Sequence, residues 1–185
     1  MIKYCSLIRD VKLIPLKAFS DSRGIFTEVY RKSWDIGIEP VQWNVVRSEA
    51  NVLRGVHAHI QHDDYLLILE GEASIGLKDL RLGSPTFTQS EMISLSGTEP
   101  ATLFIPKGVA HGFYFHTSAM HLYSVSHYWN LDDELGCFWN DPALELDWPA
   151  TNPLLSERDA SASSLADMMK QLQKTHDTLP YESIL

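Results

Sequence analysis

Three histidines have a spacing that suits proton transfer or metal binding. His57 and His59 lie two residues apart in the stretch RGVHAH (54–59), and His111 ends the stretch PKGVAH (106–111). In an extended strand, residues two apart point to the same face. His57 and His59 therefore share a face, and His111 converges on them if the two stretches pair in one β-barrel. Imidazole carries protons near neutral pH and ligates metals, so both chemistries are open.

Short strands are expected to position these histidines. Runs rich in β-branched and aromatic residues alternate with turn residues, as in the segments 20–24 and 37–40. The expected strands cover residues 11–16, 26–30, 41–46, 52–59, 64–70, 72–79, 86–95, 101–106, 111–116 and 119–128. Short strands at regular spacing predict an all-β fold, either a sandwich or a barrel.

The C-terminal part changes character. Leu165, Met168 and Leu172 recur at helical spacing and predict one helix over about residues 156–173, with Ser156 or Ser161 as its N-cap. The apolar stripe of this helix is expected to cover one face of the barrel.

The bulk composition bounds the class of protein. The chain has 185 residues, 44% hydrophobic and 21% charged, which fits a single domain over residues 1–185 with a sizeable core. Its net charge of −9 argues against general nucleic-acid binding. Cys5 and Cys137 predict free thiols in a reducing compartment. Charges interrupt the N-terminal segment, and no apolar run reaches the roughly 18–20 residues of a membrane span, so a cytoplasmic location is expected.

Longer motifs narrow the family. They are DSRGIFTE (21–28), QWN (42–44), VLRGVH (52–57), DLRLGSPTF (79–87), IPKGVAHGF (105–113), WNDP (139–142), WP (148–149) and LSERDA (155–160). In order and spacing, from about residue 13 to residue 160, they resemble the dTDP-4-dehydrorhamnose 3,5-epimerases of the cupin superfamily. The resemblance implies a cupin jelly-roll barrel with a short C-terminal helical segment.

The resemblance also implies a reaction. Its substrate is a dTDP-linked 4-keto-6-deoxyhexose, whose ketone acidifies hydrogens at C3 and C5. A base removes one of them, and an acid on the other face returns a proton and inverts the centre. This chemistry implies no redox cofactor and no metal. The products of such enzymes are rhamnose-type deoxysugars for surface polysaccharides such as the O-antigen of lipopolysaccharide.

By resemblance, His57 is the base, Asp159 orients its ring, and Tyr123 is the acid on the opposite face. Positions that bind nucleotide or sugar in the family, or that border its catalytic residues, are Arg23, Phe26, Glu28, Gln42, Asn44, Arg54, His59, Asp64, His111, Glu134 and Arg158. Arginine suits phosphate because its guanidinium group binds oxygens bidentately. Arg54 and His57 are three residues apart, so both reach one site only if Gly55 marks a bulge.

Two positions depart from the family. His59 stands where the family usually has glutamine, and Asp64 stands where it has an active-site lysine. A lysine there would stabilise the enolate oxygen, whereas an ionised carboxylate would oppose it. We therefore expect altered regiochemistry or an altered substrate, with His62 or His59 supplying the missing positive charge.

Three other interpretations remain open. His57, His59, Asp63 or Asp64, and His111 match the ligand spacing of metal-binding cupins, which hold Fe, Mn, Ni or Zn. The His57/His59 pair also resembles that of the sugar nucleotide 3,4-ketoisomerases. A non-catalytic sugar-nucleotide-binding cupin is the third.

Enzymes of this family form homodimers in which an N-terminal strand crosses to the neighbour. The resemblance therefore implies that strands within residues 1–48 reach a partner, so that Arg23 and Glu28 serve the partner's site. Trp43 and Trp129 are compatible with such an interface. No nucleic acid or membrane is expected as a partner.

Overall fold

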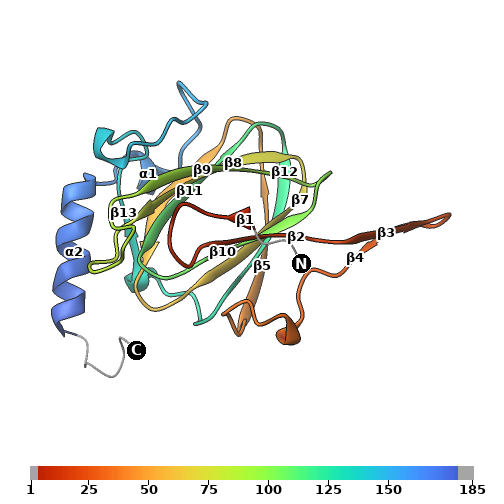
Figure 1. Cartoon of the computed structure of the whole chain (residues 1–185). Helices are drawn as coiled ribbons and strands as arrows, with labels where there is room; N and C mark the ends of the chain where they lie inside the picture. Colours follow the sequence, from red (N-terminus) through yellow and green to blue (C-terminus); the bar gives the residue numbers. More distant parts are fainter. Residues whose placement is uncertain (1–3, 179–185) are drawn as a thin grey trace.

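Two antiparallel β-sheets pack face to face and form a jelly-roll barrel, as the computed structural model of residues 4–178 shows (Figure 1). The first sheet has the strand order β1-β2-β10-β7-β12-β5. Its strands are β1 (Tyr4–Cys5), β2 (Lys12–Pro15), β5 (Gln42–Ser48), β7 (Asp64–Glu70), β10 (Ala101–Ile105) and β12 (Ala119–Val125).

The second sheet has the order β13-β6-β11-β8-β9. Its strands are β6 (Leu53–His59), β8 (Glu72–Asp79), β9 (Ser90–Ser96), β11 (Val109–Phe115) and β13 (Glu134–Gly136). Short 3-10 helices lie at Lys32–Trp34, Leu131–Asp133 and Pro142–Leu144. The predicted all-β jelly roll is therefore confirmed.

Apolar side chains from both sheets meet between the layers. Leu66 and Leu103 come from the first sheet, and Ile75, Leu77 and Phe115 from the second; each is at most 1% exposed. Burying one such side chain contributes on the order of 2 kcal/mol. Strands β7, β11 and β12, which carry Asp64, His111 and Tyr123, all contribute side chains to this core.

The outer face of the second sheet is covered by the C-terminal region. Leu165 and Met168 of helix α2 (Leu165–Thr178) pack against Leu53, Val56 and Ala110. The helix lies at the end of the molecule beyond β13 (Figure 1). The expectation that an apolar helical stripe covers the barrel is confirmed.

The single helix predicted over about 156–173 is, however, two helices. Helix α1 (Glu157–Ala160) begins at the N-cap Ser156 and ends at Ser161, which is a C-cap and not an N-cap. Helix α2 starts after Ser164, whose hydroxyl accepts from the Asp167 N–H at 3.2 Å and donates to its carboxylate at 2.8 Å. The run of serines breaks the helix because serine hydroxyls satisfy backbone groups locally and start a new helix.

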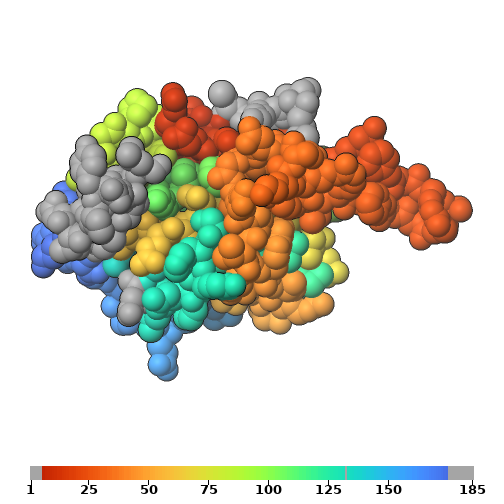
Figure 2. All heavy atoms as spheres, turned by 90° about the horizontal axis from the view of Figure 1, so that it is seen from below, coloured from red at the N-terminus to blue at the C-terminus, as the bar shows by residue number. Residues whose placement is uncertain are grey.

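Strands β3 (Ala18–Asp21) and β4 (Gly24–Thr27) form a separate two-stranded hairpin. It extends away from the barrel body in both views (Figures 1 and 2). The strand predicted at 26–30 is wrong in its bounds, because the turn after Asp21 closes the hairpin early and the chain leaves the strand after Thr27. Ile25 and Phe26 are 73% and 62% exposed.

Within the described residues, no helix has both the length and the apolarity needed to cross a membrane.

Candidate active site

A cavity of about 570 Å³ opens between the two sheets next to helix α1. Nine of the predicted site residues line it: Arg54, His57, His59, Asp64, His111, Tyr123, Glu134, Arg158 and Asp159. The expected convergence of His57, His59 and His111 is therefore confirmed. A larger hollow of about 670 Å³ lies elsewhere, along β9, β10 and the segment after β2, and is lined by residues such as Glu72, Glu99 and His116. The smaller cavity is the candidate site because it gathers the convergent titratable groups.

A bulge in β6 brings Arg54 and His57 to the same cavity. His57 pairs with His111 and Gly55 with Gly112, so Val56 is the extra residue in the ladder. Gly55 has a φ of +110°, and a Cβ there would lie 2.8 Å from the Gly112 Cα atom. Only glycine fits so close an approach, and the bulge expected at Gly55 is confirmed.

His57 and Asp159 form a short imidazole–carboxylate pair. The His57 Nε2 atom lies 2.7 Å from Asp159 Oδ1. Asp159 sits in the first turn of α1, where the hydroxyl of Ser156 accepts from its N–H at 3.1 Å. The backbone N–H of Gly55 points at its second oxygen from 3.5 Å. Burial raises the pKa of Asp159, but the contacts with His57, Ser156 and Gly55 together outweigh it and hold that pKa below its ordinary value.

Glu134 and Arg158 hold the other side of the His57 ring. Glu134 Oε1 lies 3.4 Å from His57 Nδ1, and Arg158 Nη1 donates to Glu134 Oε2 at 2.6 Å. Burial raises the pKa of Glu134, but its interactions with Arg158, His57 and Trp129 together bring it below its ordinary value. Arg158 Nη2 also approaches His57 Nε2 to 2.7 Å and so competes with Asp159 for that atom. When Nε2–H donates to Asp159, Nδ1 carries the lone pair of a base.

Tyr123 lies on β12, opposite Asn44 of β5. Burial raises the pKa of its hydroxyl, and the carboxylates of Asp64 and Glu134 raise it further. The phenol therefore stays protonated and is able to donate. Arg54, whose Nε donates to Ser48 at 3.0 Å, is a positive group that acts against this rise.

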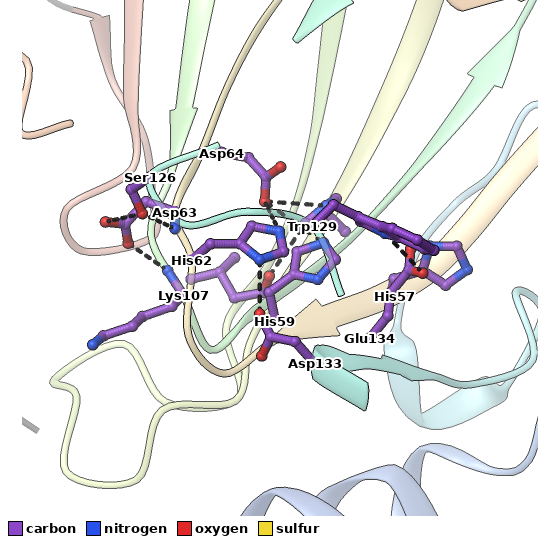
Figure 3. A network of polar contacts seen from close by, with 12 residues as sticks. His57, His59, His62, Asp63, Asp64, Lys107, Ser126, Trp129, Asp133 and Glu134 are labelled. Atoms are coloured by element: carbon purple, nitrogen blue, oxygen red, sulfur yellow. Dashed lines mark hydrogen bonds and ion pairs between the residues drawn. The ribbon is translucent and has the colours of Figure 1, made fainter. Parts of the chain in front are cut away.

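A second cluster surrounds Asp64 (Figure 3). The Nε2 atoms of His59, His62 and His111 lie 3.6, 3.9 and 3.8 Å from Asp64 Oδ2. Burial raises the pKa of Asp64 to about 7 and lowers that of His111 to about 4. Burial also lowers the pKa of His59 well below its usual range.

His62 is charged more readily than its neighbours. Its Nδ1 lies 2.7 Å from Asp133 Oδ2, and both side chains are 1% exposed. Burial disfavours the imidazolium ion, but the Asp133 hydrogen bond and the Asp64 carboxylate raise the pKa of His62 above its ordinary value. Asp133 also accepts from the N–H groups of Ile60 and Gln61, both at 2.8 Å.

The ligand set expected for a metal-binding cupin is not the set that meets here. His57 faces Asp159, and Asp63 accepts from the Lys107 N–H at 2.9 Å, away from the cluster (Figure 3). The histidine that joins His59, Asp64 and His111 is His62. Asp133 was missed altogether, since an acidic run in a loop gives no signal of a buried carboxylate.

The remaining predicted residues lie outside the cavity of this chain. Arg23 is exposed on the hairpin and pairs with Asp21 at 2.6 Å, while Glu28 pairs with Arg31 just beyond the hairpin. Phe26 is also on the hairpin. Gln42 and Asn44 lie on β5 and hydrogen-bond each other at 2.9 Å. The hairpin residues thus stand apart from the residues with which the resemblance groups them.

Comparison with known proteins identifies the family. The family model described as dTDP-4-dehydrorhamnose 3,5-epimerase matches residues 6–167. The epimerase of that name from Pseudomonas aeruginosa is 38% identical over 86% of this chain and 93% of its own length. The one from Neisseria gonorrhoeae is 36% identical over 91% of this chain, which spans only 54% of that relative's length.

Solved structures agree. The 3,5-epimerase from Legionella pneumophila in complex with dTDP-4-keto-L-rhamnose has a TM-score of 0.86 and 34% identity, over 92% of this chain and 96% of that one. A 3'-monoepimerase from Streptomyces bikiniensis in complex with dTDP-quinovose has a TM-score of 0.83 and 25% identity, over 94% and 96%. The fold is therefore shared by enzymes described as acting on two centres and on one.

Proposed function

The chain belongs to the dTDP-4-dehydrorhamnose 3,5-epimerase family, and we propose that it epimerises a dTDP-linked 4-keto-6-deoxyhexose at C3, at C5 or at both. Such an enzyme is an isomerase of deoxysugar biosynthesis. The observation that carries the proposal is the His57–Asp159 pair, which faces a cavity that Tyr123 also lines.

In the proposed mechanism, His57 is the base. Asp159 accepts from Nε2–H and fixes the tautomer, so Nδ1 takes the proton from the carbon next to the ketone. The electron pair of the broken C–H bond moves to the C4 oxygen and forms an enolate. Asp159 then stabilises the imidazolium ion, because a carboxylate 2.7 Å away favours the charged ring.

Tyr123 completes the inversion. Its neutral hydroxyl gives a proton to the opposite face of the same carbon, and the enolate electrons return to form the C–H bond. Exchange with solvent returns a proton to Tyr123 and removes one from His57. Arg54 offers positive charge to the diphosphate, and its position in the same cavity supports that role.

We also propose that the working unit is a homodimer. The exposed Ile25 and Phe26 and the extension of the hairpin from the barrel support this (Figure 2). An apolar arm of this kind gains free energy when a second copy covers it. Arg23, Phe26 and Glu28 would then complete the cavity of the partner, beside its Gln42 and Asn44.

Solvent isotope exchange tests the proposal. The chain is incubated with a dTDP-linked 4-keto-6-deoxyhexose in heavy water, and the product is followed by NMR. Deuterium at C3 alone, at C5 alone or at both supports epimerisation and shows which centre inverts. A ketone moved to C3 indicates a ketoisomerase instead, and no deuterium in the bound sugar overturns the enzymatic proposal.

A further inference from the structure

We propose that His59, His62, His111 and Asp64 bind one divalent first-row transition-metal ion, with Zn²⁺ as the best match, in the wall of the substrate cavity. The three Nε2 atoms surround one carboxylate oxygen at 3.6–3.9 Å. One potential ligand atom from each of His59, His62 and Asp64 lies within 4.8 Å of the others.

These separations are too long for hydrogen bonds and suit an ion placed between the atoms. In a tetrahedral zinc site with bonds of about 2.0–2.1 Å, neighbouring ligand atoms lie about 3.3–3.4 Å apart. The observed Nε2–Oδ2 separations exceed that value by about 0.2–0.6 Å. The His59 and His62 rings stack with their centroids 3.9 Å apart, so one of them must turn for both Nε2 atoms to face the same ion. Three imidazoles and one carboxylate also match the ligand preference of zinc and its neighbours in the first transition row.

The outer nitrogens of two rings are already held as metal-bound histidines require. His62 Nδ1 lies 2.7 Å from the carboxylate of Asp133, and His111 Nδ1 lies 3.1 Å from the carbonyl oxygen of Val109. Partners of this kind fix the ring and leave Nε2 free for the ion. The outer nitrogen of His59, Nδ1, has no hydrogen-bond partner among the described residues, so the chain does not hold this third ring in the same way.

Charge and burial support the same assignment. All four ligand residues and Asp133 are at most 6% exposed, which places two carboxylates beside three imidazoles away from water. Buried carboxylates are costly unless cations compensate them. A divalent ion would compensate both with the three rings neutral, and it would add positive charge to a cavity wall where residues 61–65 contain no lysine.

The experiment measures metal binding and does not depend on turnover. Untagged full-length protein is analysed for metal content by mass spectrometry, then stripped with chelator and titrated calorimetrically with Zn²⁺. We expect about one ion per chain. Co²⁺ loading should also give the visible absorption bands of a low-coordinate site. A folded protein that takes up neither Zn²⁺ nor Co²⁺ at micromolar concentration overturns the proposal.

Variants locate the ion. His59→Gln and Asp64→Asn should each weaken Zn²⁺ binding at least about 10-fold. Asp133→Asn, which removes the carboxylate that holds the outer nitrogen of His62 without removing a ligand, should weaken it about 10–100-fold. His57→Asn is the matched control in the same strand and cavity, and it should leave the affinity unchanged. Loss of the ion in His57→Asn, with retention in Asp133→Asn, overturns this ligand set. Thermal unfolding of each metal-free variant confirms that it is folded.

The same variants keep this proposal separate from the epimerase. His57→Asn should lose isotope exchange and keep the ion, whereas failure of the epimerase proposal leaves the titration with Zn²⁺ unaffected.

Discussion

The pKa values of two buried aspartates in one cavity, Asp159 and Asp64, shift in opposite directions. Asp159 is 5% exposed and Asp64 is 6% exposed, so surface exposure does not distinguish them, although Asp64 lies deeper in the protein. Asp159 lies 2.7 Å from an imidazole nitrogen, and its pKa falls, whereas the nearest imidazole nitrogen to Asp64 is 3.6 Å away and its pKa rises to about 7. Close hydrogen-bonding partners lower the pKa of Asp159, whereas greater depth without such partners raises the pKa of Asp64.

The two sides of the cavity therefore differ in how well the chain itself provides hydrogen-bonding partners for the carboxylate. Around Asp159 the chain supplies its own short contacts, from His57, Gly55 and the N-terminal turn of α1. Around Asp64 it supplies three imidazole rings whose Nε2 atoms lie 3.6–3.9 Å from the carboxylate, too far for hydrogen bonds. The proposed epimerisation uses the first side, and the proposed metal ion binds on the second. Changing one member on either side tests the contrast.

The largest effect is expected on the Asp159 side. His57→Asn removes the base, and the rate of solvent deuterium incorporation should fall by about 10³-fold. NMR of the sugar in heavy water measures it. His116→Asn is the matched control: this exposed histidine hydrogen-bonds Ser74 outside the cavity, and exchange should stay within about 2-fold of the parent. Equal losses in both variants would contradict a distinct role for His57.

A third buried aspartate, Asp79, lies outside the cavity and has a strong cationic partner, so it serves as a reference for the other two. Asp79 is fully buried and accepts two hydrogen bonds from the Arg81 guanidinium group, at 2.9 and 2.8 Å, and one each from Ser84 and Thr86. Asp79→Asn should lower the free energy of unfolding by about 2 kcal/mol, because it removes a fully buried charged acceptor of several hydrogen bonds, whereas the partly exposed Arg81 keeps its contacts with Arg9 and Asp10. Urea unfolding measures the change, and a loss below about 1 kcal/mol would show that this ion pair is dispensable.

The same residue predicts a pH dependence. Burial raises the pKa of Asp79, but the Arg81, Ser84 and Thr86 hydrogen bonds outweigh it and bring the pKa to about 2. A lowered folded pKa stabilises the protein above the unfolded pKa of about 3.8, by roughly 2 kcal/mol, and that contribution disappears as the pH falls toward 2. The difference in unfolding free energy between parent and Asp79→Asn should therefore shrink between about pH 5 and pH 2.

Asp159→Asn is expected to have an effect of about 10²-fold on isotope exchange. Asp159 acts through His57, so it is a positioning residue, and its loss should reduce kcat more than it raises KM. Equal changes in kcat and KM, or a variant that no longer folds, would mean that Asp159 only supports the fold.

The sequence predicted most of the barrel strands, but not the short strands at the sheet edges or the break between the two C-terminal helices. The strands at 64–70 and 72–79 were predicted at their observed bounds, because Gly71 separates two long β-rich runs. The two-residue and three-residue strands β1 and β13 were missed, since their pairing depends on long-range neighbours and not on a local pattern. The break between α1 and α2 was missed because the helical spacing of the apolar residues suggested one continuous helix, although serines that can cap a helix lie within it.

The site was predictable in unequal parts. His57, Tyr123 and Asp159 follow from resemblance, and the structure brings them to one cavity. His62 and Asp133 are 71 residues apart, and only the fold places their side chains 2.7 Å from each other. The resemblance points to the Asp159 side of the cavity, and the departures from the family fall on the Asp64 side.

The smallest expected effect is on the free energy of unfolding of Asp64→Asn, and it is a gain and not a loss. In chelator at about pH 8, Asp64→Asn should raise the free energy of unfolding by about 1 kcal/mol, because an amide is cheaper to bury than a carboxylate without a close cation. Asp159→Asn, measured alongside, should lower it. With Zn²⁺ present the parent protein should become more stable than Asp64→Asn, since the ion stabilises the parent and not the Asp64 variant. If Asp64→Asn is destabilised in chelator, Asp64 is a structural partner of the three histidines, and the contrast between the two aspartates fails.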